Sequence, residues 1–576
     1  MLNLIQNQVD LIQKLAELVK SSKLSMDYNL VEGKLDYLAF FSEAGGFYIF
    51  KYLDTVSFNI FFSEYRNLVF VFDQKNISKI LAQNDLFLPS NTVDIMLAGY
   101  VENSSFPNDL HSQAARKLNQ DYELEYQPST DSLFNTEIEL DSFKEMETRL
   151  KLLFDLGSNY DTSLPEKLKY LWQEVESPVS EILGKMELKG VYLDKVKLEE
   201  ISAKLFEKAR YFETQIREKL QDPSLNVNST QQLATSLIKN GFDLQKIAGK
   251  GKISTDKDTL DQLSPGDNTG LIKEILEYRT VSKLYSTYTD SFLGQIDSQN
   301  RLHGQYSQAQ VATGRLSSNS PNLQNIPIRN PEYGPLIRSC FTSPEGYTLV
   351  GADYSQFELR LLAHFSGDPT LINAFELNQD IHARTAAEIF EIPLAQVTKE
   401  ERRVGKTLNF ALVYQQGVFA TSLQLGVEQK QAKAFMEKYF GRFARVKPFI
   451  NEVLQKAREV GYVETFLGRR RHFQNLNSGQ AMLRKAEERA AFNAVLQGSN
   501  ADLIKLAMIS IEKELKSKNL DGEIVLQVHD ELVLEVKSQE AEEIQKIVIT
   551  QMQAGQPLKV PILVESGLGK NWNECK

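Results

Sequence analysis

The sequence predicts a multidomain protein of the α/β and α+β classes. Its 576 residues are enough for several domains, and its composition, 42% hydrophobic and 24% charged, is that of an ordinary globular protein. The pattern changes near residue 170, where short aromatic-rich runs give way to long helical ones. Strands mixed with helices in the first part, and strands between long helices in the rest, indicate more than one folded unit.

The first part of the chain contains three candidate strands. Residues 34–42, 47–53 and 67–73 are rich in aromatic and β-branched side chains, and a glycine pair at 45–46 predicts a turn between the first two. Helical candidates surround these strands. We therefore expect an α/β or α+β unit here.

Long helices dominate the middle of the chain. Residues 176–300 follow a helical pattern with charges on the outer face, and residues 301–350, rich in Ser, Asn, Pro and Gly, predict loops and short strands. The remaining elements are a strand over 348–353, a helix over 356–365, a mostly helical stretch over 380–460, a long helix over 480–516 and a hairpin over 523–536.

Charge and cysteine content narrow the protein class. The net charge of −11 argues weakly against nucleic acid as a partner, although an acidic body can carry a basic groove. Two cysteines provide neither a disulfide framework nor a cysteine metal cage, which fits a reducing compartment. No apolar run approaches membrane-spanning length, so we expect a soluble, cytoplasmic protein without a membrane partner.

Three acidic residues follow or join apolar strands. Asp353 ends one strand, and Asp530 and Glu531 lie at the tip of the C-terminal hairpin. Taken singly, such acids are helix caps or turn formers. Taken together, two strands that end in carboxylates can hold a pair of divalent cations for phosphoryl transfer, and Mg²⁺ needs only one or two carboxylates besides substrate phosphates.

The helix predicted over 401–414 has an unusual face. Arg402, Lys406, Phe410 and Tyr414 recur at every fourth residue and therefore lie on one side. The two cations could neutralise a triphosphate, and the two aromatic rings could pack against a sugar and a base. An interdomain helix that packs its aromatic residues is the simpler interpretation of this pattern alone.

A third group consists of polar residues suited to a nucleic-acid backbone. Amides and arginines can reach phosphates, sugars and minor-groove acceptors without reading sequence. Each of them alone is more typical of an ordinary polar surface. The group comprises Arg315, Asn322 and Gln324 in residues 312–329, and Arg489, Asn493 and Gln497, spaced four apart on one helix face, with a basic cluster at 468–472.

In combination these motifs resemble a known family. The stretches DYSQFELR (353–360), RRVGKTLNF (402–410) and QVHDE (527–531) resemble the three polymerase motifs of family A DNA polymerases. TGRLSS, PNLQNIP, DIH at 380–382 and the ERAA…QG helix match the same family. The resemblance is to the large fragment of bacterial enzymes of this family; it covers nearly the whole chain and is strongest over 301–540.

The resemblance implies a right-hand architecture of palm, fingers and thumb with an N-terminal exonuclease-like domain. The implied division is 1–170 for a 3′–5′ exonuclease-like domain, 171–310 for thumb and connection, 311–385 for the first part of the palm, 386–480 for the fingers and 481–576 for the second part of the palm. The implied activity is extension of a primer 3′-OH with dNTPs on a DNA template, in repair and replication, by a monomer.

The resemblance also implies roles for individual residues. Two Mg²⁺ ions, with Mn²⁺ as a substitute, would be held by Asp353 and Asp530, with Glu531 a less essential neighbour. The implied dNTP contacts are Gln356, Glu358, His382, Arg402, Lys406, Phe410 and Tyr414, with Lys406 also a proton donor and Glu358 a screen against a 2′-hydroxyl. The implied contacts to primer and template are Arg315, Asn322, Gln324, Arg489, Asn493, Gln497 and His529.

The sequence departs from the family in two places. The family's NFG-x-x-YG reads NFALVYQQG here, so that Ala411 and Gln415 replace glycines and Gln416 follows. We expect both replacements to stiffen the helix and to alter closure of the fingers, since glycine in a helix costs about 1 kcal/mol relative to alanine.

The N-terminal region lacks the acids of a proofreading exonuclease. The Asp-x-Glu expected on the first strand is missing, and the only copy in this region, at 121–123, follows the strand-rich part. At the second acidic site the best match, residues 73–77, places Ile77 where an aspartate belongs. We expect a degenerate, inactive domain, and the 5′ nuclease of full-length relatives is expected to be absent.

Two alternatives remain at this point. A single-subunit RNA polymerase shares the metal-binding acids and the cationic helix, although Glu358, VHDE and TGRLSS favour a DNA polymerase. A catalytically attenuated, DNA-binding homologue would be expected to have lost the metal-binding acids, and Asp353 and Asp530 are both present.

Overall fold

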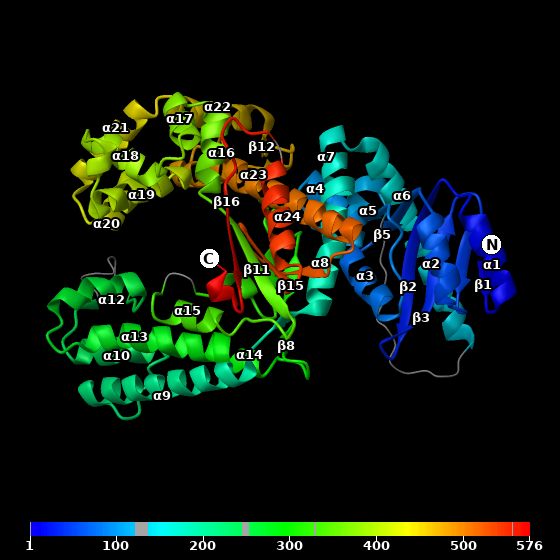
Figure 1. The fold of residues 1–576 in the computed structure, drawn as a ribbon, viewed down its shortest axis with the longest axis horizontal. Coiled ribbons are helices and arrows are strands. Elements are labelled where there is room, and N and C mark those ends of the chain that lie inside the picture. The colour runs from blue at the N-terminus through cyan, green and yellow to red at the C-terminus, as the bar shows by residue number, and fades with distance from the viewer. Residues whose placement is uncertain (1, 121–135, 245–252, 328–329, 556, 576) are drawn as a thin grey trace. The chain divides into compact units, whose positions relative to one another are not determined.

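The computed structural model describes residues 2–120, 136–244, 253–327, 330–555 and 557–575. Its contacts divide the chain into two compact units (Figure 1). Unit 1 contains residues 1–188, 305–319 and 350–567, and unit 2 contains residues 189–304, 320–349 and 568–576. In the described ranges no helix is both long and apolar enough to cross a membrane.

The N-terminal part of unit 1 contains a six-stranded mixed sheet in the order β1-β4-β3-β2-β5-β6. Strand β3 is antiparallel to both of its neighbours, β2 and β4, whereas the pairs β1–β4, β2–β5 and β5–β6 are parallel. The strands are β1 (Leu2–Ile5), β2 (Lys23–Val31), β3 (Lys34–Ser42), β4 (Gly46–Phe50), β5 (Leu68–Val71) and β6 (Thr92–Asp94).

Helices cover both faces of this sheet because its strands alternate between two apolar cores. Tyr37 and Ala39 of β3 belong to one core, and Leu38 and Phe40 to the other. The helices are α1 (Gln8–Leu18), α2 (Thr55–Glu64), α3 (Gln74–Gln83), α4 (Ile95–Glu102), α5 (Leu110–Leu118), α6 (Thr136–Ser163), α7 (Glu166–Tyr170), the π-helix η1 (Leu171–Glu176) and α8 (Ser177–Lys189). The three strands expected from sequence are β3, β4 and β5.

The second sheet of unit 1 has four strands in the order β14-β15-β11-β16. Its strands are β11 (Tyr347–Tyr354), β14 (Gly522–Val528), β15 (Glu531–Lys537) and β16 (Val564–Gly569), so the predicted strand over 348–353 and hairpin over 523–536 are confirmed. Helices α16 (Phe357–Ser366), α23 (Ala481–Lys518) and α24 (Ala541–Ala554) share its apolar core.

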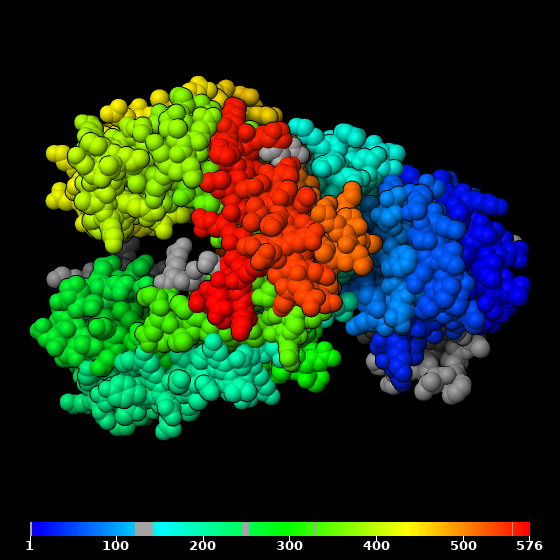
Figure 2. Space-filling view, viewed as in Figure 1, coloured from blue at the N-terminus to red at the C-terminus, as the bar shows by residue number. Residues whose placement is uncertain are grey.

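A helical subdomain and two short hairpins complete unit 1. The helices are α17 (Pro369–Glu376), α18 (Ile381–Phe390), the 3₁₀ turn η5 (Leu394–Gln396), α19 (Lys399–Val413), α20 (Val418–Leu425), α21 (Gln429–Arg442) and α22 (Val446–Val460). In the space-filling view the yellow-green and yellow atoms of this subdomain lie together (Figure 2). The hairpins are β12 (Tyr462–Glu464) with β13 (Arg470–His472), and β9 (Gln305–Ser307) with β10 (Ser317–Asn319).

Unit 2 is mainly helical, as predicted for most of residues 176–300. Helices α9 and α13 pack against each other through apolar faces that include Leu198, Leu205, Ile275 and Val281. Its elements are β7 (Val191–Tyr192), α9 (Lys195–Lys219), α10 (Thr230–Lys239), α12 (Lys257–Leu263), η2 (Ser264–Gly266), α13 (Leu271–Leu284), η3 (Tyr285–Asp290), α14 (Ser291–Leu293), β8 (Arg301–Leu302), η4 (Leu323–Asn325), α15 (Tyr333–Arg338) and η6 (Trp572–Glu574).

Candidate active site

Two of the predicted acids meet at the second sheet of unit 1. Asp353 lies near the end of β11, and Asp530 lies in the tight turn between β14 and β15. The backbone N–H of Tyr354 donates to the carbonyl oxygen of Asp530 at 3.2 Å, so the turn that carries Asp530 lies beside the end of β11 that carries Asp353. The turn requires His529 in the left-handed region, at φ 59°.

Burial dominates the electrostatics of Asp530. Burial raises the pKa of Asp530, the charges of Arg315 and His529 lower it, and Glu531 raises it again. Glu531 itself is 3% exposed. A carboxylate in such a position gains from any cation that approaches it.

Arg315, Glu358 and Tyr414 form a polar cluster beside these acids. Arg315 donates a hydrogen bond to Glu358, in the first turn of α16. Burial raises the pKa of Glu358, the guanidinium of Arg315 opposes this, and Asp530 raises it further. A hydrogen bond with Glu358 also contributes to the raised pKa of Tyr414, after burial. Residues of α16, of the end of α19 and of the β14–β15 turn therefore meet in one place.

The cationic and aromatic face of α19 is confirmed. A capping box between Thr398 and Glu401 fixes the start of the helix. The rings of Phe410 and Tyr414 stack with centroids 6.2 Å apart and an interplanar angle of 9°. Lys406 and Phe410 are exposed, so the face is open to a ligand.

Helix α18 lies close against α19 because the chain has a glycine at 405. A Cβ on Gly405 would lie 2.2 Å from the carbonyl oxygen of His382, so no other residue fits. This approach brings His382 of α18 to the same face, where its ring lies 5.9 Å from that of Phe410.

Two residues that sequence reasoning missed hold this face in place. Asp380 caps α18 and forms an ion pair with Arg402 at 2.7 Å. Asn409 donates through Nδ2 to His382 Nδ1 at 3.0 Å, while its Oδ1 accepts from the hydroxyl of Thr385. The N-cap pattern before α18 could have identified Asp380, whereas no local pattern indicates Asn409.

His382 is held in its neutral form. Burial, followed by the charges of Arg402 and Lys406, lowers the pKa of His382 to about 4, against the opposing effect of Asp380. Because Nδ1 accepts from Asn409, the proton of the neutral ring lies on Nε2. His382 therefore carries an N–H donor.

The expectation that both glycine replacements stiffen the helix is wrong at Gln415. Helix α19 ends at Val413, and Gln415 lies beyond it with φ 51°. The N–H groups of Gln415 and Gln416 bond back to Leu412 and Ala411, which is a Schellman motif with glutamine at its left-handed position. Only Ala411, which is fully buried, lies within the helix.

The predicted nucleic-acid contacts fall in both units. Arg489, Asn493 and Gln497 lie four residues apart on α23. Arg489 is exposed, and Asn493 and Gln497 are half-buried. All other residues from 491 to 500 are buried. Gly498 allows α23 to approach Thr313, because a Cβ there would lie 2.9 Å from the Thr313 carbonyl oxygen. This face is therefore the open side of an otherwise buried stretch of helix.

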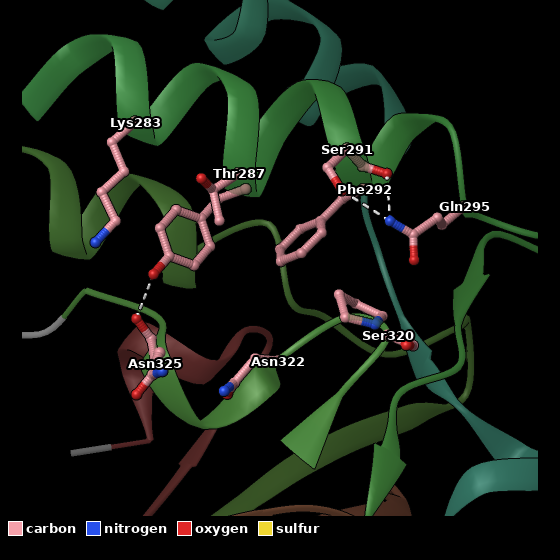
Figure 3. A pocket seen from close by; sticks show the side chains of 10 residues that line it. Lys283, Thr287, Ser291, Phe292, Gln295, Ser320, Asn322 and Asn325 are labelled. Carbon is pink, nitrogen blue, oxygen red and sulfur yellow. Dashed lines mark hydrogen bonds between the residues drawn. The ribbon is translucent and has the colours of Figure 1, made fainter. Parts of the chain in front are cut away.

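Unit 2 contains a polar cavity of about 720 Å³ (Figure 3). It is lined by Lys283, Thr287, Tyr288, Ser291, Phe292, Gln295, Ser320, Pro321, Asn322 and Asn325. Tyr288 fixes one wall by donating to the carbonyl oxygen of Asn325 at 2.6 Å. Asn322 lines the cavity, whereas Gln324 is only 8% exposed and is not among the lining residues.

The residues matched from sequence to the second acidic position of a proofreading site take part in the local fold. Asp73 caps α3, and Ile77 lies in the core at 1% exposure. The Asp-x-Glu at 121–123 lies outside the described residues. Within the described part of the chain no group of three or more His, Cys, Asp or Glu residues could hold a metal ion.

Comparisons with known proteins identify the family of the chain. A sequence model of DNA polymerase family A matches residues 195–574. DNA polymerase I of Pseudomonas aeruginosa is 41% identical over 404 residues, 70% of this chain and 44% of that protein. The thermostable DNA polymerase I of Thermus filiformis is 42% identical over 424 residues, 73% of this chain and 50% of that protein. The chain thus spans about half the length of these relatives.

A solved structure extends the match over the whole chain. The POL domain of Pol1 from M. smegmatis, in complex with DNA primer-template and dNTP, superposes with a TM-score of 0.90 at 30% identity, covering 100% of both chains. The fold predicted from the sequence, a polymerase hand with an exonuclease-like N-terminal sheet, is thereby confirmed. The chain belongs to DNA polymerase family A.

Proposed function

We propose that the chain is a DNA-directed DNA polymerase that extends a primer 3′-OH with dNTPs and releases pyrophosphate, in DNA repair and replication. The observation that carries this proposal is the meeting of Asp353 and Asp530 through the hydrogen bond from Tyr354 to Asp530. The M. smegmatis relative, solved with primer-template and dNTP, supports the choice of substrates. The division into palm, fingers, thumb and exonuclease-like domain given above remains part of the proposal.

Asp353 and Asp530, with Glu531 beside them, are the groups that would hold two Mg²⁺ ions. Hard carboxylate oxygens are the donors that Mg²⁺ and its substitute Mn²⁺ prefer, and one or two carboxylates suffice when substrate phosphates complete the shell. When bound, such ions supply Lewis-acid stabilisation of the attacking and leaving oxygens. The raised pKa of Asp530, caused mainly by burial, fits a site that gains from a cation.

The face of α18 and α19 would bind the triphosphate. Arg402 offers a planar fork that is oriented by Asp380, and His382 offers its Nε2–H as a neutral donor. Lys406 is exposed on the same face and would donate a proton to the leaving pyrophosphate.

The cluster around Glu358 would enclose the sugar. Glu358, positioned by Arg315, would exclude a 2′-hydroxyl, with Gln356 beside it at the start of α16. Phe410 and Tyr414 would pack against the sugar and the nascent base pair, because their stacked rings form the apolar part of the same face.

Two polar surfaces would hold the DNA. In unit 1 these are Arg489, Asn493 and Gln497 on α23, together with His529 and Arg315. In unit 2 the polar cavity offers donors of the kind that bind phosphate and sugar oxygens, from Lys283, Thr287, Ser291 and Asn322. Gln324 is buried two residues after Asn322 and would help to position it.

We propose that proofreading is absent. The first strands carry no Asp-x-Glu, and the position expected for the second acid is the buried Ile77. The measurement is primer degradation with Mg²⁺ and no nucleotides. Degradation that a substitution within 1–170 abolishes would contradict this part of the proposal.

Template-directed incorporation tests the proposed function. A labelled primer is annealed to four templates that differ in the first unpaired base, and each dNTP and rNTP is offered separately with Mg²⁺. We expect addition of only the complementary dNTP on each template, and we expect Glu358→Ala to raise rNTP addition selectively. Preference of the wild type for rNTPs would instead favour the RNA polymerase, and no addition at all would favour a non-catalytic homologue.

A further inference from the structure

Residues 305–315 are held by the N-terminal part of the chain at three points. Lys75 of α3 donates to the carbonyl oxygen of Tyr306 at 2.6 Å, and Tyr100 of α4 donates to that of Val311 at 2.6 Å. Gln308 donates through Nε2 to the carbonyl and carboxylate oxygens of Glu176 at 2.9 and 2.6 Å. Residues 305–319 accordingly belong to unit 1, although the residues on either side belong to unit 2.

These contacts are buried and specific. Tyr100 is 1% exposed and Gln308 is 5% exposed. Tyr306 also donates its N–H to Glu187 at 2.8 Å, and Lys75 forms an ion pair with the same carboxylate at 2.7 Å. Both backbone groups of Tyr306 are thus bound to side chains of other elements, which fixes the start of the segment.

The other end of the segment is fixed by a buried ion cluster. Arg469 pairs with Glu176 and with Asp502, and Lys505 pairs with Glu176 at 2.7 Å. Burial opposes ionisation of Glu176, yet Lys505 and Arg469 lower its pKa to about 2. Charges buried in this way hold one geometry, because separating them leaves an unpaired charge in the core.

Arg469 also sets the path of the backbone before Arg315. Gly314 has φ 87°, and a Cβ on it would lie 2.6 Å from Nε of Arg469. The guanidinium therefore packs directly on the peptide that precedes Arg315. Arg315 in turn donates to Glu358, the group that faces the sugar in the proposed function.

We propose that the exonuclease-like domain acts as a brace for the polymerase site. Lys75 and Tyr100 of this domain, together with Glu176 just beyond it in η1, are positioning residues: they fix residues 305–315 so that Arg315 remains on Glu358. The inference rests on the proposed role of Glu358 and Arg315. It gives a domain without proofreading acids a function in nucleotide incorporation.

Tyr100→Phe is the sharpest test, because it removes only the hydroxyl that holds Val311. The matched control is Tyr65→Phe. Tyr65 is equally buried at 1% exposure in the same domain and donates to the carbonyl oxygen of Ser21 at 3.1 Å, but it belongs to the other apolar core of the sheet from Tyr100. Single-turnover kpol and the apparent Kd of dNTP are measured for both variants, with melting temperatures in parallel.

We expect Tyr100→Phe to lower kpol/Kd about fivefold, as for loss of one hydrogen bond, while Tyr65→Phe matches wild type at a similar melting temperature. If Tyr100 acts through Arg315, adding Tyr100→Phe to Arg315→Ala causes less than about a twofold further loss. The brace would be contradicted if Tyr100→Phe lowered kpol/Kd by the same factor in the Arg315→Ala background as in wild type. It would also be contradicted if Tyr100→Phe and Tyr65→Phe had equal effects on kpol/Kd. Should Tyr100→Phe not fold, Gln308→Ala is put through the same cycle and judged by the same outcomes.

Two outcomes distinguish the role of Arg315 from the role of the exonuclease-like domain. Wild-type incorporation by Arg315→Ala would overturn the role of Arg315 itself, and the brace with it. A strong loss in Arg315→Ala combined with wild-type kinetics in Tyr100→Phe would overturn the brace alone.

Discussion

The N–H of Tyr354 donates to the carbonyl oxygen of Asp530 at 3.2 Å, which joins the end of β11 to the β14–β15 turn. The two carboxylates at this junction come from positions 177 residues apart in the chain, 530 minus 353. This backbone hydrogen bond does not involve either carboxylate. Substitution of either carboxylate by its amide should therefore leave the junction intact, which makes such variants clean probes of charge.

The ring of Phe410 predicts discrimination against chain terminators. A dNTP has a 3′-OH that can make a local polar contact, whereas a dideoxynucleotide lacks it and phenylalanine cannot replace it. We expect Phe410→Tyr to remove most of the discrimination, since one hydrogen bond contributes about 0.5–1.5 kcal/mol. The measurement is the kcat/KM ratio of dNTP to ddNTP for both proteins. Equal ratios would mean that Phe410 does not face the sugar.

The end of α19 predicts opposite effects for two glycine substitutions. Gln415→Gly should stabilise the protein by about 1 kcal/mol, because a side chain in the left-handed region is strained. Ala411→Gly should destabilise it by about 1 kcal/mol or more, because this residue lies inside the helix and is buried. Urea unfolding of each variant measures both.

The same pair of variants tests the effect on finger closure. We expect the double glycine variant to change single-turnover incorporation or error frequency rather than abolish activity. Unchanged rate and error frequency would contradict a role of this segment in closure, and a destabilising Gln415→Gly would contradict the left-handed assignment.

His382 predicts a pH-dependent contribution to stability. Its pKa is about 4 in the folded protein and about 6.5 in an unfolded chain. The unfolded chain therefore binds more protons between these values, so the contribution is complete above pH 6.5 and is lost as the pH falls toward 4. Between pH 7 and pH 5 we expect the free energy of unfolding to fall by about 1 kcal/mol less for His382→Gln than for wild type, after a discount for solvent screening. Urea unfolding at both pH values measures this, and parallel losses would contradict the buried, neutral histidine.

The sequence predicted local elements of the site better than the contacts between them. The strand before Asp353, the hairpin that carries Asp530 and the one-sided face of α19 all follow from residue periodicity. The pairing of Arg315 with Glu358 and the support of His382 by Asn409 link distant segments, and no local pattern encodes such contacts.

The helix boundary at Val413 shows a second limit of sequence reasoning. The pattern favours a helix through Tyr414, and glutamine is an ordinary helical residue. The chain nevertheless turns at Gln415, because the N–H groups of Gln415 and Gln416 bond back into the last turn. The usual glycine signal for such an end is missing here, so the turn could be seen only in three dimensions.

The two-carboxylate site is the central claim, and Asp530→Asn tests it most directly. Single-turnover primer extension with four dNTPs and Mg²⁺ is measured for wild type, Asp530→Asn and the control Asp521→Asn, which lies next to the other end of β14, with primer-template affinity in parallel. We predict that Asp530→Asn loses at least about 100-fold in rate while it keeps its DNA affinity, and that the control matches wild type. Extension by Asp530→Asn at the wild-type rate would contradict the account.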